Sequence, residues 1–211
     1  VSAAEELGAE VNVQNANGDI KEQIRQIDYL IEKGVDVIVV VHVADDELSI
    51  NGALARAEAA GIPVIAYDRL INGTDAVDYY ATFDNYQVGQ LQGEFIEEEL
   101  GLANGEGPYN LEPFAGSPDD NNASFFFSGA WDVLLPYVES GQLVVPSGKS
   151  PASNDEWTSI GILGWKSADA QSEMDNRLQS FYTGGDKVDV VLSPNDSLAL
   201  GIEASLESAG Y

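Results

Sequence analysis

Two spacings of apolar residues alternate along the chain. An early run of isoleucines recurs every three or four residues and predicts one face of a helix that ends at Gly34. These isoleucines are Ile20, Ile24, Ile27 and Ile31. The next run, residues 35–41, is almost entirely valine and isoleucine, as is typical of parallel strands buried in a sheet. The pattern therefore predicts a helix followed by a buried strand.

The same alternation continues to the end of the chain. Further strands are predicted at residues 11–14, 62–67, 79–82, 111–115, 143–146 and 188–192. Further helices are predicted at residues 46–61, 85–100, 123–140, 168–182 and 197–209. Strands that alternate with helices in this way indicate an α/β fold with mainly parallel sheets.

The segment 101–108 contains three glycines and a proline, which predicts a loop between two parts of the chain. We predict two similar α/β lobes, residues 1–108 and 109–211, joined near residues 105–110. The first residues resemble the end of a helix, and the last helix stops where another strand would follow. We therefore expect the chain to be truncated at both ends.

The composition indicates a globular protein with an acidic surface. Hydrophobic residues make up 44% of the 211 residues, enough for a packed core. The chain has no cysteine, which excludes disulfides, thiol nucleophiles and cysteine metal sites. Its formal net charge of −27 argues against nucleic acid or anionic lipid as partners, because binding them needs lysine and arginine. No Walker loop, glycine-rich dinucleotide motif or ordered set of metal ligands is present, so we expect no cofactor and no metal.

Polar residues stand at the predicted ends of strands, where open α/β sheets bind their ligands. Asp68 and Arg69 follow the predicted strand at 62–67. The segment 116–123, which reads Gly-Ser-Pro-Asp-Asp-Asn-Asn-Ala, joins a predicted strand to a helix. Two carboxylates and two carboxamides therefore crowd one strand end.

The residue types at these positions suit a sugar. Asp68 would accept hydrogen bonds from hydroxyls, and Arg69 would donate to a hydroxyl and to the ring oxygen. Asn122 and Asn195 would add neutral donors and acceptors, and Trp165 would cover the apolar face of a pyranose. We therefore predict a carbohydrate site.

The same residues also have structural explanations. An aspartate after a strand is often only a helix cap. This capping role is the alternative for Asp84, for Asp196 and for one of Asp119 and Asp120. Trp165 could equally belong to the core, although its glycine and lysine neighbours favour an exposed or ligand-facing ring.

A carbohydrate-active enzyme is the alternative from another class, with Asp119 or Asp120 as its carboxylates. These two residues are adjacent, whereas a glycosidase needs carboxyl groups on opposite sides of the scissile bond. The only histidine, His42, lacks a serine or acid motif, which favours a structural or rim-lining role. We predict no catalytic residue.

Three motifs carry a resemblance to a known family: Ala66-Tyr67-Asp68-Arg69-Leu70-Ile71, Gly116-Ser117-Pro118-Asp119-Asp120-Asn121-Asn122-Ala123 and Leu192-Ser193-Pro194-Asn195-Asp196. They resemble the sugar-binding proteins of ABC transporters, in particular the xylose-binding and ChvE-type multiple-monosaccharide receptors. The resemblance implies a type I periplasmic-binding-protein fold, with two doubly wound parallel-sheet lobes joined by hinge crossings, and no enzymatic activity. It also implies that the first lobe lacks its first strand and that the second lobe is incomplete, so we expect these 211 residues alone to fold marginally and to bind ligand poorly.

The resemblance also implies a function and a set of sugar contacts. The implied function is the extracytoplasmic solute-binding subunit of an ABC importer, which binds an aldose such as xylose, glucose or galactose between its lobes. The implied partners are permease subunits and a sensor or chemoreceptor. We expect a monomer in the periplasm or outside the cell, where a lipid anchor is an option. By matching motif, the implied contacts are Asp68, Arg69, Asp120, Asn122, Trp165 and Asn195.

The alternative within the same fold is the ligand-sensing core of a LacI-type transcriptional repressor. It would require a DNA-binding helix pair before residue 1. The net charge of −27 argues only against DNA binding by this segment.

Overall fold

The computed structural model describes residues 1–43 and 47–211. Within them the chain forms two compact units, Val1–Thr82 and Phe83–Tyr211, each with its own sheet and its own hydrophobic core. Both sheets are parallel and both units contain packed helices, so the predicted α/β class is confirmed. The expected start of one helix, at residue 46, lies outside the described residues.

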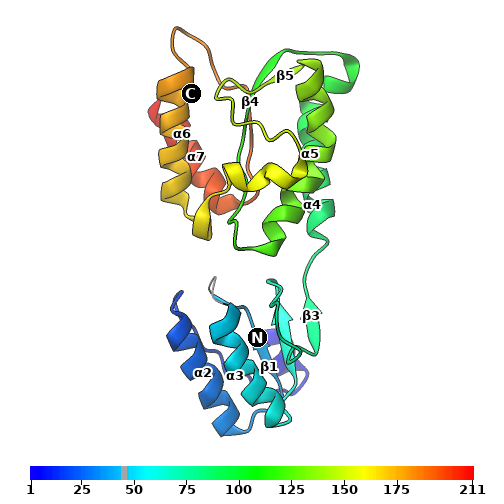
Figure 1. Cartoon of the computed structure of the whole chain (residues 1–211), viewed down its shortest axis with the longest axis vertical. Coiled ribbons are helices and arrows are strands. Elements are labelled where there is room, and N and C mark those ends of the chain that lie inside the picture. The colour runs from blue at the N-terminus through cyan, green and yellow to red at the C-terminus, as the bar shows by residue number, and fades with distance from the viewer. Residues whose placement is uncertain (44–46) are drawn as a thin grey trace. The chain divides into compact units, whose positions relative to one another are not determined.

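The first unit is a three-stranded parallel sheet with helices packed against it. Its elements are α1 (Ser2–Glu6), α2 (Ile20–Lys33), β1 (Ile38–Val40), α3 (Glu47–Ala59), β2 (Val64–Tyr67) and β3 (Tyr79–Ala81). The strand order is β1-β2-β3, and α2 and α3 lie side by side (Figure 1). The helix predicted from the isoleucine spacing is α2. It begins after the capping residue Asp19 and ends at Gly34, whose φ is 69°.

The strands of the first unit alternate in burial. Ile38, Val40 and Val64 belong to the core that α2 and α3 help to form, whereas Val39 is 59% exposed. The valine-rich strand is therefore not buried on both faces, because among the described residues the core lies on one side of it. The strand predicted at 11–14 does not form; Val13 in this segment is 66% exposed.

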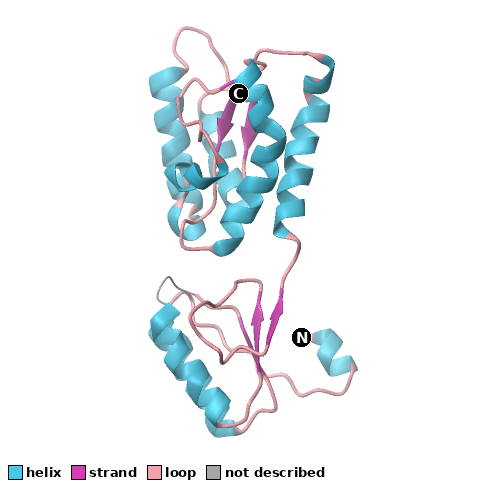
Figure 2. Cartoon of the chain, turned by 45° about the vertical axis from the view of Figure 1, so that its right-hand side comes forward, coloured by secondary structure: helices cyan, strands magenta, loops and turns pink. Residues whose placement is uncertain are grey.

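In the second unit, helices cover both faces of a three-stranded parallel sheet. Its helices and strands are α4 (Asn85–Glu99), β4 (Tyr109–Pro113), α5 (Asn121–Ser140), β5 (Leu143–Val144), α6 (Ser167–Phe181), β6 (Val190–Leu192) and α7 (Asp196–Ser208). Short 3-10 helices occur at Leu102–Asn104, Asn154–Ile160 and Leu163–Trp165. α4 and α5 lie on one face of the sheet and α6 and α7 on the other (Figures 1 and 2). This is the doubly wound arrangement that the resemblance implies.

The two strands that follow β4 in the sequence pair with its opposite edges. The strand order is β5-β4-β6, so β5 lies on one side of β4 and β6 on the other. Gly161 adds a further parallel bridge to Ala115, just beyond the end of β4. Open α/β sheets bind their ligands at the carboxyl ends of strands where the strand order reverses in this way. The segment that follows β4 therefore lies at the edge where a ligand is expected.

The boundary between the units falls earlier than the sequence-based expectation near residues 105–110. α4 packs along α5 in the second unit, and glycines allow the two helices to approach closely. A β-carbon added to Gly129 would lie 2.0 Å from the backbone oxygen of Tyr86, and one added to Gly89 would lie 2.1 Å from that of Phe126. Residues 83–108 therefore belong with the second unit.

Replacing Gly129 by alanine should destabilise the second unit by about 1–3 kcal/mol, because the methyl group can only be accommodated if the backbones of α4 and α5 move apart. Thermal unfolding followed by circular dichroism measures the change. Gly52→Ala in α3 is the matched control, since its β-carbon would meet only an arginine side-chain nitrogen at 3.8 Å. Alanine favours helix over glycine, so the control should be neutral or stabilising. Equal effects of the two substitutions would contradict the close packing.

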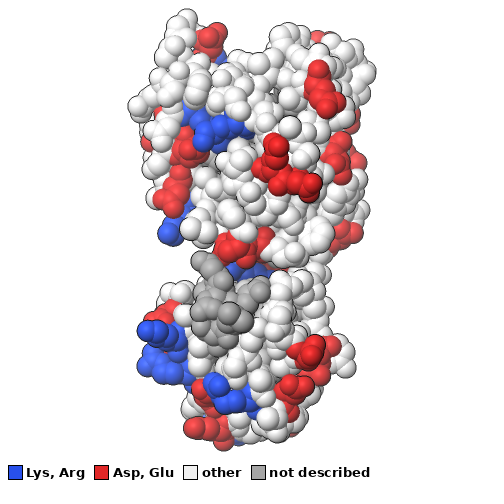
Figure 3. All heavy atoms as spheres, viewed as in Figure 1, with Lys and Arg blue, Asp and Glu red and all other residues white. Residues whose placement is uncertain are grey.

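Acidic side chains are spread over both units on the face that Figure 3 shows. This distribution indicates a solvated acidic surface that favours solubility. No described helix has the length and apolar character needed to cross a membrane. Among the described residues, no three histidine, aspartate or glutamate side chains gather in a way that could hold a metal ion.

Candidate functional site

In the first unit, Asp68 and Arg69 directly follow β2, as the sequence predicts. The backbone of Asp68 is held by the neighbouring strand: its N–H donates to the carbonyl of Ala81 at 2.8 Å. Its own carbonyl accepts from the hydroxyls of Tyr80 at 2.9 Å and Thr82 at 3.2 Å. The side chain of Asp68 is exposed, and that of Arg69 is partly exposed. Both side chains can therefore meet a ligand at the carboxyl edge of this sheet.

Backbone strain marks two of the predicted site residues. Three described non-glycine residues have a positive φ: Asn17 at 49°, Asp68 at 67° and Trp165 at 56°. Such a backbone is uncommon for aspartate and unusual for a bulky aromatic residue, and it costs about 1–3 kcal/mol. Strain of this kind persists where the surroundings impose it, and it concentrates at binding and catalytic sites.

In the second unit, Asp120 and Trp165 come together after β4. Asp120 caps α5, because its Oδ1 accepts from the N–H of Asn122 at 3.0 Å. Its Oδ2 accepts from Nε1 of the Trp165 indole at 3.1 Å. The structure therefore brings three of the predicted site residues to one strand end.

Asn122 is held by a residue that the sequence analysis did not single out. Its side-chain oxygen accepts from Nδ2 of Asn85 at 2.9 Å, and both side chains are buried. Asn85 opens α4 directly after Asp84, which caps that helix through a bond from Gln87 N–H at 3.0 Å. The capping role considered for Asp84 is thus confirmed. Asn85 opens the helix predicted at residues 85–100, just after the strand predicted at 79–82, and this place between a strand and a helix was the signal that could have identified it.

Asn195 lies at the end of β6, but its hydrogen-bonding capacity is partly in use. Its Oδ1 caps α7 by accepting from the N–H of Leu198 at 3.0 Å. The sequence predicts that Asn195 offers a sugar both a donor and an acceptor. Because Oδ1 is engaged in the cap, Asn195 can offer its amide N–H groups and the second lone pair of Oδ1. Asp196 is the first residue of the helix and not its cap.

The remaining polar residues of the segment after β4 support the loop that carries Trp165. The hydroxyl of Ser117 donates to the carboxylate of Asp119 and accepts from the N–H of Gly164 at 2.7 Å. Asp119 is thus tied to its own segment, where it supports a loop.

His42, for which the sequence favours a structural or rim-lining role, lies just after β1 and is 5% exposed.

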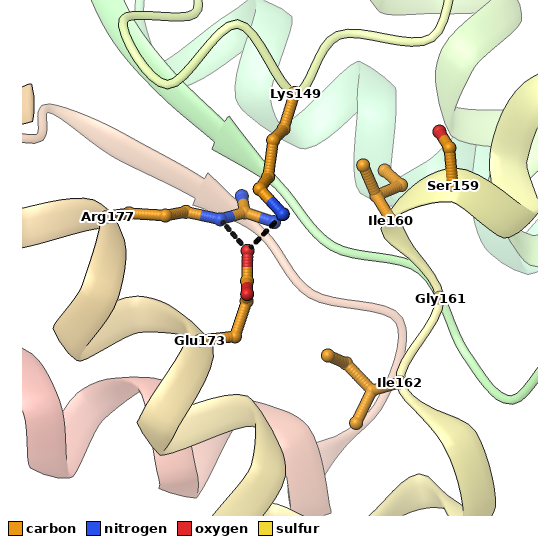
Figure 4. A pocket seen from close by; sticks show the side chains of 7 residues that line it. All are labelled: Lys149, Ser159, Ile160, Gly161, Ile162, Glu173 and Arg177. Carbon is orange, nitrogen blue, oxygen red and sulfur yellow. Dashed lines mark hydrogen bonds and ion pairs between the residues drawn. The ribbon is translucent and has the colours of Figure 1, made fainter. Parts of the chain in front are cut away.

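A second polar cluster lies inside the second unit, beside a small pocket of about 70 Å³ (Figure 4). Arg177 and Glu112 form a buried ion pair, with 2.9 Å between Nη1 and Oε2 and at most 1% exposure of either side chain. Glu112 also accepts from the hydroxyls of Ser147 and Tyr182, both at 2.7 Å. The residues that line the pocket are Lys149, Ser159, Ile160, Gly161, Ile162, Glu173 and Arg177.

The charges around this pocket are balanced. Glu173 pairs with Arg177 Nε and with Lys149 Nζ, both at 2.9 Å. The guanidinium carbon of Arg177 lies 3.9 Å from the ring centre of Phe114, a favourable contact for a cation. Two cations therefore face two carboxylates, Glu112 and Glu173. We interpret this cluster as a structural ion-pair network that ties β4 to α6.

The pKa values of two groups follow from this arrangement. Burial favours the neutral form of Glu173, but hydrogen bonds from Lys149 and Arg177 outweigh it, so the pKa of Glu173 lies below its ordinary value. Burial, and then the hydrogen bond to Glu112, raise the pKa of Tyr182 far above its ordinary value. The Tyr182 hydroxyl therefore stays protonated and remains a donor to the buried carboxylate.

Comparison with known proteins places these features in a family. A family model described as periplasmic binding protein domain matches residues 1–211. The chain is 48% identical over 204 residues to the multiple sugar-binding periplasmic protein SbpA of Azospirillum brasilense, a match that covers 97% of this chain. It is 46% identical over 211 residues to the multiple sugar-binding periplasmic receptor ChvE of Rhizobium radiobacter. The chain spans 55% and 57% of the length of these two relatives.

A solved structure shows the same fold. The ABC transporter solute-binding protein of Clostridium phytofermentans, with bound β-D-glucose, superimposes with a TM-score of 0.88 at 46% sequence identity. The match covers 98% of this chain and 62% of that one.

Proposed function

We propose that this chain, which belongs to the family of periplasmic binding protein domains, is the sugar-binding part of the receptor subunit of an ABC importer. Its ligand in this proposal is a monosaccharide of the aldose class, such as glucose, xylose or galactose. Support comes from relatives described as multiple sugar-binding proteins and from a related structure that holds β-D-glucose.

The observation that carries the proposal is the strained backbone at Asp68 and Trp165. Both residues stand at the carboxyl edge of a parallel sheet, and each has a side chain suited to one part of a sugar. The Asp68 carboxylate accepts from hydroxyls while Arg69 donates to oxygen atoms. The Trp165 ring offers a flat surface to the C–H face of a pyranose, and Asn122 and Asn195 add polar contacts.

The proposed role is binding and delivery without chemical change of the sugar. The two adjacent aspartates are committed to local structure: Asp120 to a helix cap and the Trp165 indole, and Asp119 to Ser117. Neither arrangement resembles a pair of carboxylates on opposite sides of a scissile bond. The proposal places the protein outside the cytoplasmic membrane, where permease subunits are its partners and a lipid anchor could tether it.

Binding of glucose should change the tryptophan fluorescence of the whole protein, and Trp165→Phe should remove most of that change, because Trp165 is the ring that meets the sugar. The chain has two other tryptophans, Trp131, which is fully buried, and Trp157. Trp157→Phe is therefore the matched control and should leave the signal in place. A signal that survives Trp165→Phe but disappears in Trp157→Phe would contradict the placement of the sugar at Trp165.

A further inference from the structure

The indole of Trp165 is packed on two sides by its own unit. Its ring lies on the backbone of Gly116, where an added β-carbon would be 2.0 Å from Cη2 of the indole. Phe126 meets the ring edge to face, with 6.5 Å between the ring centres and 80° between the planes. Only glycine at position 116 leaves room for the ring in this place.

Asp120 completes this arrangement from a third direction. Both of its carboxylate oxygens accept from protein N–H groups, Oδ1 from Asn122 and Oδ2 from the indole. Its side chain is 7% exposed. A buried carboxylate is stabilised by each N–H that it accepts, and an indole nitrogen can only donate. The bond between them therefore favours a single orientation of the ring.

We propose that Asp120 is a positioning residue, which orients Trp165 for stacking on the sugar. The inference rests on the proposed function. A ring that is fixed before the sugar arrives loses little freedom on binding, so more of the stacking energy appears as affinity. Asp120 thus contributes to sugar binding through the orientation of another side chain.

Asp120→Ser separates the two roles of this side chain. Serine caps helices about as well as aspartate, so α5 keeps its cap, but the shorter hydroxyl cannot reach the indole. We expect solvent exchange of the Trp165 Nε1–H proton, identified in NMR spectra by its loss in Trp165→Phe, to become about tenfold faster. We expect the affinity of the whole protein for glucose to fall about 3- to 10-fold. The control Asp19→Ser, at the cap of α2, should change neither quantity.

A double-mutant cycle distinguishes positioning from direct contact. In the Trp165→Phe background, Asp120→Ser should cost less affinity than in the unchanged protein, because the part of the loss that comes from the orientation of the indole is gone. Equal losses in both backgrounds would show that Asp120 acts on the sugar without the indole, and an unchanged indole proton in Asp120→Ser would show that it does not hold the ring. If the unchanged protein binds no sugar at all, the proposed function is wrong, while the indole proton still tests the positioning role.

Discussion

Replacing Arg177 by methionine should lower the free energy of unfolding of the second unit by about 3–5 kcal/mol. The guanidinium is 1% exposed and pairs with Glu112, which is fully buried. Without it, the Glu112 carboxylate keeps hydroxyl donors from Ser147 and Tyr182 but loses its cation while it stays buried. Urea unfolding monitored by the tryptophans, all three of which lie in the second unit, measures the loss.

Two further variants test the cause of that loss. The double replacement Glu112→Gln with Arg177→Met removes both charges and should recover most of the stability, because the larger part of the penalty is the unpaired buried carboxylate. Arg56→Met breaks an ion pair with Asp28 whose side chains are 52% and 40% exposed. That control should cost below about 1 kcal/mol, measured by circular dichroism. Similar losses for Arg177→Met and Arg56→Met would contradict a buried network.

Arg69→Ala and Asp68→Asn should each weaken sugar binding by the whole protein by about 1.5–3 kcal/mol, the range for hydrogen bonds to charged groups. This corresponds to roughly a 10- to 150-fold rise in Kd. Asparagine is chosen at position 68 because it tolerates the positive φ of 67° better than alanine does. Equilibrium dialysis with labelled glucose measures Kd.

The control for the loss of a charge is Arg25→Ala, in α2 of the same unit. Arg25 pairs with Glu22 on an exposed helix surface, and its removal should leave Kd unchanged. Unchanged Kd for both Arg69→Ala and Asp68→Asn, across glucose, xylose and galactose, would remove these residues from the site.

The helices could be predicted from the sequence because their signals are local. α2 shows this most clearly: the isoleucine spacing and the terminating Gly34 predict it, and the structure adds the cap at Asp19, all within 16 residues of sequence. The unit boundary could not be predicted in this way. Its position depends on α4 packing against α5 through Gly89 and Gly129, and a glycine inside a helix does not reveal which partner approaches it.

The residue types and strand-end positions of the candidate site could be read from the sequence, but the hydrogen bonds among its side chains could not. The sequence places Asp120, Asn122 and Asn195 after strands, where caps and ligand contacts look alike. The structure shows that Asp120 and Asn195 act as caps. Asn122 meets Asn85, a residue 37 positions away. Such pairings depend on tertiary structure, because no local pattern fixes the distance between side chains on different elements.

Calorimetric titration of the whole protein with D-glucose, D-xylose and D-galactose tests the central claim most directly. We expect saturable binding of one sugar per chain to at least one of the three, and recovery of the sugar chemically unchanged afterwards. A folded protein that gives no saturable heat with any of them, or that converts a bound sugar or glycoside into another product, would contradict the claim that this chain is the sugar-binding part of a transport receptor.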